Sequence, residues 1–88
     1  MIRDFRPLNQ PGAIEVVTDA DGQPCAVRRP RWPTARRVAR VQDRWRIDDE
    51  WWREHPISRA YYEVVLDDGS LLTMYQDLIA DEWFEQRS

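Results

Sequence analysis

Two Asp-Gly dipeptides, Asp21-Gly22 and Asp68-Gly69, constrain the fold of this chain more than any other feature. Asp-Gly between alternating apolar residues is a strong local signal for a tight β-hairpin, because glycine readily adopts the positive φ that such turns need. The first dipeptide follows a strand candidate at 13–18, and the second separates strand candidates at 57–66 and 71–76. The sequence therefore predicts two antiparallel hairpins.

A two-residue loop fixes which residues face one another in each hairpin. The expected pairs in the first hairpin are Thr18 with Cys25, Val16 with Val27, Val17 with Ala26 and Glu15 with Arg28. The expected pairs in the second hairpin are Leu66 with Leu71, Val64 with Thr73 and Tyr62 with Tyr75. The first set places an acid opposite an arginine, which supports the register.

The segment 34–49 is compatible with a helix or with a strand. A helix places Arg36 and Arg37 at its N-terminus, where positive charge opposes the helix dipole. A strand places mostly apolar residues on one face: Ala35, Ala39, Val41, Trp45 and Ile47. The other face then carries Val38 and four arginines: Arg36, Arg40, Arg44 and Arg46. We predict the strand, with its arginine face directed away from the core.

About six short strands follow, the last at 82–86. Hairpin-like connections between them predict an all-β, mainly antiparallel fold, a meander curled into a small barrel or a strongly bent sheet. The polar stretch 48–56 is expected to add one short helical turn that ends before Pro56. Residues 1–12 are expected to form an N-terminal arm, and residues 13–88 a single small β domain.

The totals argue against several other classes of protein. A chain of 88 residues fits one domain with one modest core. No stretch approaches the ~20 apolar residues of a membrane span, so we expect no membrane partner. The first seven residues lack the apolar centre of a signal peptide, and the single cysteine, Cys25, fits a reducing compartment. We therefore expect a cytoplasmic protein.

Residues suited to catalysis occur without a recognisable spacing. Cys25 and His55 lie in different predicted segments, which favours a small buried thiol over a nucleophile. The acids around His55 match no known metal-binding loop, which favours a solvated acidic segment. The three glycines are too far apart for a phosphate-binding loop. We expect no enzymatic activity, no cofactor, no metal and no small-molecule substrate.

Charge is strongly segregated along the chain. Residues 28–46 hold eight arginines and one acid, whereas residues 47–88 hold three arginines and eleven acids. Guanidinium groups neutralise phosphates and indole rings stack on unpaired bases, so the basic segment is a candidate nucleic-acid surface. The alternative is that these arginines pair with the acidic half, within the fold or across a dimer. The candidate binding residues are Arg28, Arg29, Arg31, Trp32, Arg36, Arg40, Arg44 and Arg46.

Adjacent aromatic residues, Trp51-Trp52 and Trp83-Phe84, indicate a second candidate surface. Neighbours in a strand point to opposite faces, so one of Trp83 and Phe84 is expected to face the core and the other to face outward. An outward ring beside arginine is typical of a protein-binding hot spot. Trp51, Trp52 and Trp83 are therefore candidate partner contacts, and packing beneath the loop is the alternative for Trp51 or Trp52.

The stretch 27–87 resembles a small bacterial domain of unknown function. The residues that carry the resemblance are 40–46 (RVQDRWR), 51–53 (WWR), 57–62 (ISRAYY), 75–77 (YQD) and 82–87 (EWFEQR). Such domains occur as short proteins, or near or fused to Y-family, translesion-type DNA polymerase-like proteins. The resemblance implies a DNA-repair neighbourhood and no established catalytic residues.

Two functional hypotheses result. The first is a non-enzymatic binding or adaptor module whose partner is a protein, either a DNA-repair polymerase, as the resemblance implies, or a second copy of the chain. The second is a domain that binds nucleic acid directly through residues 28–46. Arginines at 36, 40, 44 and 46 that are exposed together favour the second hypothesis, and arginines paired with acids favour the first.

Overall fold

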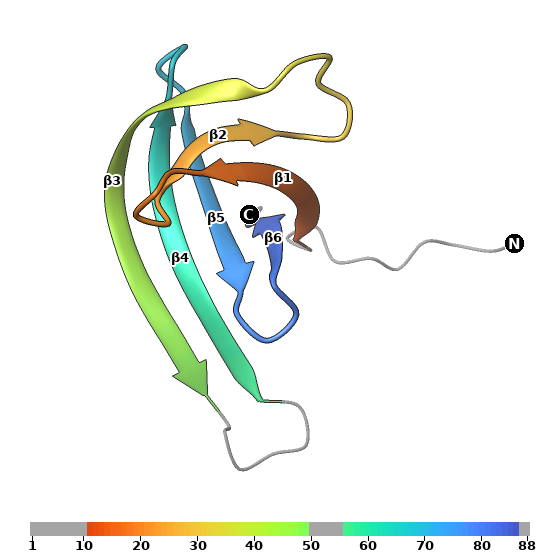
Figure 1. Cartoon of the computed structure of the whole chain (residues 1–88), viewed down its shortest axis with the longest axis vertical. Helices are drawn as coiled ribbons and strands as arrows, with labels where there is room; N and C mark the ends of the chain where they lie inside the picture. The colour runs from red at the N-terminus through yellow and green to blue at the C-terminus, as the bar shows by residue number, and fades with distance from the viewer. Residues whose placement is uncertain (1–10, 50–55, 87–88) are drawn as a thin grey trace, which may run out of the picture.

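The computed structural model describes residues 11–49 and 56–86, which form six antiparallel strands closed into a small barrel. The strands are β1 (Gly12–Thr18), β2 (Pro24–Arg28), β3 (Arg36–Asp49), β4 (Ile57–Leu66), β5 (Leu71–Asp77) and β6 (Glu82–Glu85). Each strand pairs with the next one, and β6 returns to pair with β1 (Figure 1). The predicted all-β meander, curled into a small barrel, is confirmed.

The described part of the chain contains no helix, and so none that could cross a membrane. The helical turn expected at 48–56 falls largely on residues 50–55, which lie outside the described residues. Asp48 and Asp49, where the turn was expected to start, extend β3 instead. The expected N-terminal arm also lies almost wholly outside the described residues, and β1 begins at Gly12.

Both Asp-Gly dipeptides lie in hairpin turns, as predicted, but each loop has three residues instead of two. In the second hairpin, the Leu66 amide donates to the Ser70 carbonyl (2.9 Å) and the Gly69 amide donates to the Leu66 carbonyl (2.9 Å). The loop is therefore 67–69, with Gly69 at a positive φ of 87°. This is a type I turn followed by a glycine bulge, a common three-residue hairpin loop.

The extra loop residue has different consequences in the two hairpins. In the first hairpin Thr18 pairs with Pro24 rather than with Cys25, and a bulge then restores the other predicted pairs, Val16 with Val27 among them. The second hairpin contains no such bulge, so its whole register differs from the predicted one by a residue. Tyr75 pairs with Tyr61 and not with Tyr62, and the predicted register of this hairpin is wrong for that reason.

The barrel interior is filled by apolar side chains from all six strands. Val27, Val64 and Met74 are fully buried at its centre. The remaining core residues and the partly buried side chains against them are Ile14, Leu66, Leu72, Val16, Trp32, Val38, Val41, Tyr62 and Trp83. Trp32 belongs to the β2–β3 loop, so this loop covers part of the core.

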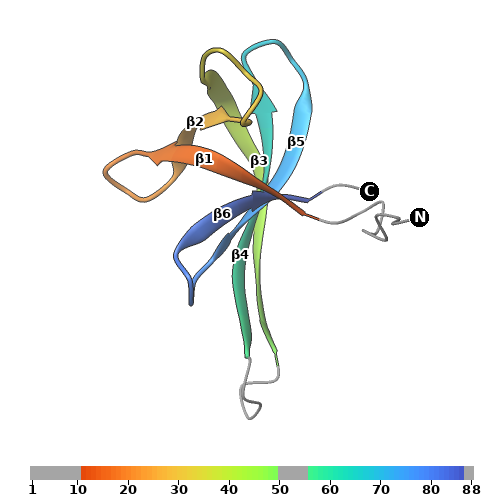
Figure 2. The ribbon, with the colours of Figure 1, turned by 90° about the vertical axis from the view of Figure 1, so that its right-hand side faces the viewer.

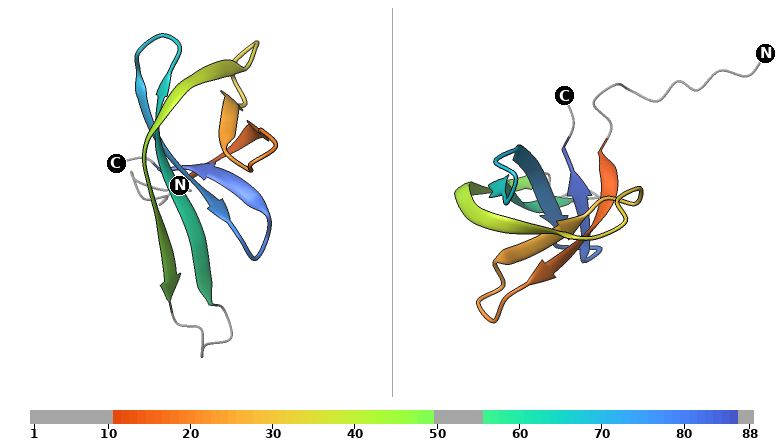
Figure 3. Two further views of the ribbon diagram at one scale, coloured as in Figure 1. Left: turned by 60° about the vertical axis from the view of Figure 1, so that its left-hand side comes forward. Right: turned by 90° about the horizontal axis from the view of Figure 1, so that it is seen from above.

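Two β-bulges make β3 longer than the strand it pairs with. Twelve residues of β3, from Val38 to Asp49, pair with the ten residues of β4. The register shifts lie between Val38 and Arg40 and between Val41 and Asp43. Bulges bend a strand and increase its twist, and β3 curves around the barrel accordingly (Figure 3).

The predicted division of β3 into a core face and an outer face is therefore largely reversed. Arg36, Val38, Arg44 and Arg46 were predicted to face outward, but they pair with residues of the inner face, and Val38 packs against the core. Only Arg40, outward, and Val41, inward, are as predicted. The first bulge moves Arg40 to the outer face, opposite Val65, and turns Val41 toward buried Val64. Beyond the second bulge, Trp45 and Ile47 also lie on the outer face. The expected core face was chosen by its apolar content, but here the outer face is apolar as well.

Candidate functional site

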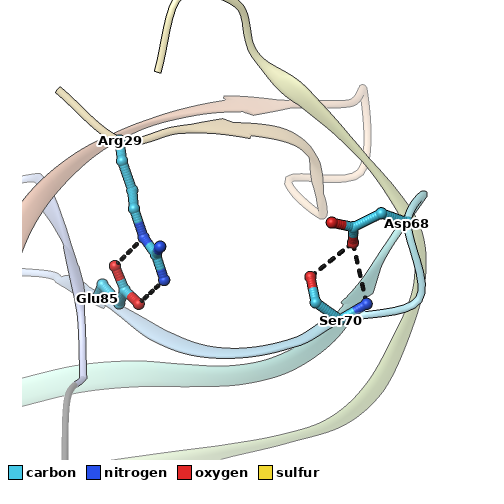
Figure 4. A network of polar contacts seen from close by, with 4 residues as sticks. All are labelled: Arg29, Asp68, Ser70 and Glu85. Atoms are coloured by element: carbon cyan, nitrogen blue, oxygen red, sulfur yellow. Dashed lines mark hydrogen bonds and ion pairs between the residues drawn. The ribbon is translucent and has the colours of Figure 1, made fainter. Parts of the chain in front are cut away.

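Three residues of the basic segment gather at the β2–β3 loop. The guanidinium carbons of Arg29 and Arg36 each lie 4.9 Å from the ring centroid of Trp32, which is cation–π distance. Arg29 also forms a two-pronged ion pair with Glu85 on β6, with 2.6 Å between Nε and Oε1 (Figure 4). Glu85 is only 5% exposed, and its hydrogen bond raises the pKa of Arg29. These residues stabilise the fold.

Arg36 also anchors the second hairpin turn, because its Nη1 lies 2.8 Å from Oδ2 of Asp68. The other carboxylate oxygen of Asp68 accepts hydrogen bonds from the Ser70 hydroxyl (2.6 Å) and the Ser70 amide (3.0 Å), as Figure 4 shows. These bonds, the hydroxyl first, lower the pKa of Asp68, and the charge of Arg36 adds to the effect. Arg36 is thus tied to the acidic half of the chain.

The remaining residues of the basic segment are dispersed. Arg28 pairs with Glu15 across the first hairpin at 2.8 Å, the cross-strand pair expected from the sequence. Arg31 is exposed in the β2–β3 loop. Arg40, Arg44 and Arg46 lie on β3, where the second bulge, between Val41 and Asp43, separates Arg40 from the face of the other two. The predicted single face of four arginines is therefore incorrect, and the eight candidates form no single surface.

The part of β3 that follows the bulges stands out from the barrel. Residues 42–48, which we call the β3 arm, are all exposed. Among the described residues β3 pairs with β2 only at Arg36 and Arg37, so the arm has β4 along one edge and no strand along the other. β3 and β4 run together past the ends of β5 and β6 (Figure 1, Figure 2). The arm thus offers a free backbone edge and two uncovered faces.

A row of aromatic rings crosses the outer face of the barrel and ends on the arm. Trp45, Tyr61, Tyr75 and Phe84 come from β3, β4, β5 and β6 and are aligned by strand pairing. Successive ring centroids lie 5.3, 5.0 and 5.3 Å apart, and the Trp45 and Tyr61 planes differ by 7°. Tyr75 is 3% exposed, whereas Trp45 is 41% exposed. The row is therefore a second apolar cluster, buried at its centre and open at the arm.

Arg59 secures the middle of this row. Its guanidinium carbon lies 4.5 Å from the Tyr75 ring centroid, and its Nη1 donates a 3.1 Å hydrogen bond to the Tyr61 hydroxyl. Burial raises the pKa of the Tyr75 phenol, an effect that the charge of Arg59 opposes. Neither Arg59 nor Ile47 was among the binding residues predicted from the sequence. Their signal is the alternation of 45 with 47 and of 59 with 61 on the outer face, and the bulges of β3 hide this facing in the sequence.

The tip of the arm is held by a polar cluster. Asp48 accepts a 2.7 Å hydrogen bond from the Ser58 hydroxyl on β4 and pairs with Arg46 at 2.9 Å. Both contacts lower the pKa of Asp48, the Ser58 hydroxyl most strongly. Arg44 has no acidic partner among the residues described here, and a shallow open pocket lies between it and Tyr62. Arg44 is thus a cation available to a partner.

The other sequence-derived candidates are placed as follows. Trp83 packs against the core and lies 5.5 Å from Tyr62, so Phe84 is the outward ring of the pair. Trp83 is only partly buried, and its role as a partner contact stays a prediction. Trp51, Trp52 and His55 fall outside the described residues. Cys25 is half-buried on β2 with a free thiol. No three potential metal ligands gather within 11–49 and 56–86.

The described residues thus form a small barrel with a row of aromatic rings that ends at the unpaired edge of β3. Searches of protein-family models, curated proteins and solved structures found no match for this chain.

Proposed function

We propose that this protein is a non-enzymatic protein-binding module, and that the β3 arm is its binding element. The observation that carries the proposal is the arm itself, a run of seven exposed residues on a strand with one unpaired edge. An unpaired edge presents backbone donors and acceptors that another strand can use, and side chains at alternate positions then provide specificity.

The side chains of the arm define the chemistry of the partner. Trp45 and Ile47, 41% and 40% exposed, project from the outer face at the two-residue spacing of a strand. Arg44 projects from the opposite face without an acidic partner within the described part of the chain. The occupant that fits is an extended protein segment with apolar side chains on one face and an acid on the other. The resemblance to domains near translesion-type polymerases makes a DNA-repair polymerase one such partner to test.

Direct nucleic-acid binding is the second candidate, favoured by one observation. Arg40 and Arg44 lack acidic partners among the described residues, and both precede the exposed ring of Trp45 on the same strand. Arg28, Arg29, Arg36 and Arg46, however, form ion pairs within the fold. This pairing is what the protein-binding hypothesis expects of the basic segment.

Affinity capture from native cells, with and without nuclease, tests the proposal. The variant is W45A with I47A, and the matched control is L71A, which removes a side chain that is 60% exposed on β5. We expect one defined protein to be captured by the wild type and by L71A, regardless of nuclease, and to be lost with the arm variant. Capture that disappears after nuclease treatment would mean that the arm binds nucleic acid, which is the second candidate function. Capture unaffected by the arm variant would reject the proposed surface.

A further inference from the structure

The side chains of the β3 arm are complementary to those of a second β3 arm. The residues from Asp43 to Asp49 pair regularly with β4, without a bulge, so outer-face and inner-face positions alternate strictly along them. The middle of their outer face carries Trp45 and Ile47, and their inner face carries two arginines, Arg44 and Arg46, followed by Asp48. In an antiparallel two-fold pair of such strands, the acidic end of each strand lies beside the arginines of the other.

We propose that two copies of this chain pair antiparallel through the free edges of their arms, with Arg46 on the two-fold axis. This inference rests on the proposed function and names a second copy as the partner. Directly opposed residues of an antiparallel pair lie on the same face. In this register Trp45 therefore lies opposite Ile47 of the second copy, and Arg44 lies opposite Asp48 of the second copy, each pair occurring twice.

This register provides partners for the exposed apolar side chains of the arm and for Arg44. The two exposed apolar side chains of the arm cover one another, and Arg44 gains the acid that it lacks among the described residues of its own chain. The two copies of Arg46 meet at the axis, where each is already paired with its own Asp48 at 2.9 Å. The like-charge pairs of this register are Arg46 opposite Arg46 at the axis, each beside its own Asp48, and Asp43 opposite Asp49 at each end.

Neighbouring registers that keep the faces aligned are less complementary. A two-fold at Trp45 places Arg44 opposite Arg46 twice and Ile47 opposite Asp43. A two-fold at Ile47 pairs Arg46 with Asp48 twice but places Trp45 opposite Asp49, and one at Arg44 places Trp45 opposite Asp43. Like charges directly opposed destabilise a strand pair, and apolar pairs stabilise it. The register centred on Arg46 is the one that joins both apolar side chains to each other.

The first test is cross-linking at the axis. In a C25S background, R46C places two thiols directly opposite each other, at the Cα separation of about 4.5–5.5 Å that a disulfide accepts. We expect mild oxidation to give a covalent dimer of R46C and none of R40C, the matched control on the same strand before the regular stretch. A dimer that R46C does not cross-link would overturn the register.

The second test is sedimentation equilibrium of the full chain over a range of concentrations. We expect a wild-type dimer that R44E weakens by about tenfold or more, because it removes two interchain ion pairs, while R40E changes the affinity by less than about threefold. A folded wild-type protein that stays monomeric throughout overturns self-pairing. If W45A with I47A still loses a captured protein in that case, the proposed function stands and the partner is another chain.

Discussion

Glu85 is the one charged residue that is buried within the described residues, and it holds Arg29 against the barrel. We expect E85Q to lower the free energy of unfolding by about 2 kcal/mol, because the variant leaves a half-buried guanidinium without its counter-charge. Urea denaturation followed by circular dichroism measures the change.

E15Q is the control, since Glu15 and Arg28 form an equally direct but exposed ion pair. Exposed pairs contribute roughly 0–1 kcal/mol, so this variant is expected to stay close to the wild type. Equal losses in the two variants would show that burial of Glu85 adds nothing to the pair.

Two serine hydroxyls set the acid titration of two carboxylates. Asp48 and Asp68 have lowered pKa values, caused chiefly by hydrogen bonds from Ser58 and Ser70. A carboxylate with a lowered pKa stabilises the fold above the ordinary pKa of 3.8, and this contribution is lost as the pH falls through the lowered value. The effect therefore belongs to the acid range and not to neutral pH.

We expect S70A to raise the pKa of Asp68 alone and S58A to raise the pKa of Asp48 alone. Carboxyl carbon shifts recorded by NMR against pH give both values in each variant, so each serine is the control for the other. Unchanged titration of Asp68 in S70A would mean that the Arg36 charge and the backbone amide suffice to hold its pKa down.

At the level of strands, the sequence was sufficient to place all six elements and both hairpin turns. It was insufficient for the register of the second hairpin, because Asp68-Gly69 is compatible with a two-residue and a three-residue loop. The first hairpin has the same three-residue loop, but a bulge beside Pro24 shifts the pairing back by one residue, so most of its predicted pairs are still correct. A shift of one residue exchanges Tyr62 for Tyr61 opposite Tyr75, and the aromatic row became visible only with the structure.

The row should behave as a coupled unit. We expect Y61L and Y75L to be less destabilising together than the sum of the single variants, with a coupling of about 1 kcal/mol, because the first substitution already breaks the stack. Urea denaturation of the four proteins in the cycle provides the value. The matched cycle pairs Y75L with V17A, an exposed position on β1, and should give a coupling near zero.

The candidate site was predictable only in part for a related reason. Strict alternation along 34–49 correctly placed Arg36, Arg44 and Arg46 on one face, but it could not show that this face is the concave one. Alternation also placed Arg40 on this face, whereas the structure has it on the other one, because bulges leave no clear trace in a sequence. The sequence does show that residues 28–46 are rich in arginine. It does not show which of these arginines form ion pairs within the fold and which lie on the arm, because the partners are up to 56 positions away in the chain.

For the whole molecule, the net charge of −3 and the internal pairing of arginines argue against a polyanion-binding surface. We expect single-stranded DNA to bind weakly at low salt and not measurably at moderate salt, because four of the eight arginines of residues 28–46 already form ion pairs within the fold and release fewer counterions from phosphates. Fluorescence anisotropy with a labelled oligonucleotide measures this.

The matched variants for that titration are R40Q with R44Q, which neutralises two arginines of β3 without an ion pair among the described residues, and R28Q, which neutralises a paired one. Saturable binding at moderate salt, with a salt dependence that R40Q and R44Q flatten and R28Q does not, would contradict the expectation.

The two bulges of β3 also bear on how this chain can change in length. Each bulge contains a residue that has no partner on β4. Val38 and Arg40 already lie opposite the adjacent residues Leu66 and Val65, so deleting Ala39 removes the bulge and leaves every later side chain on its present face. Deleting Arg44, in the regular stretch, instead reverses the faces beyond it or shifts the whole strand. We expect cross-strand NOEs between Trp45 and Tyr61 to survive the first deletion and vanish in the second. Evolution could therefore shorten this strand at its bulges while the arm keeps the same outward residues.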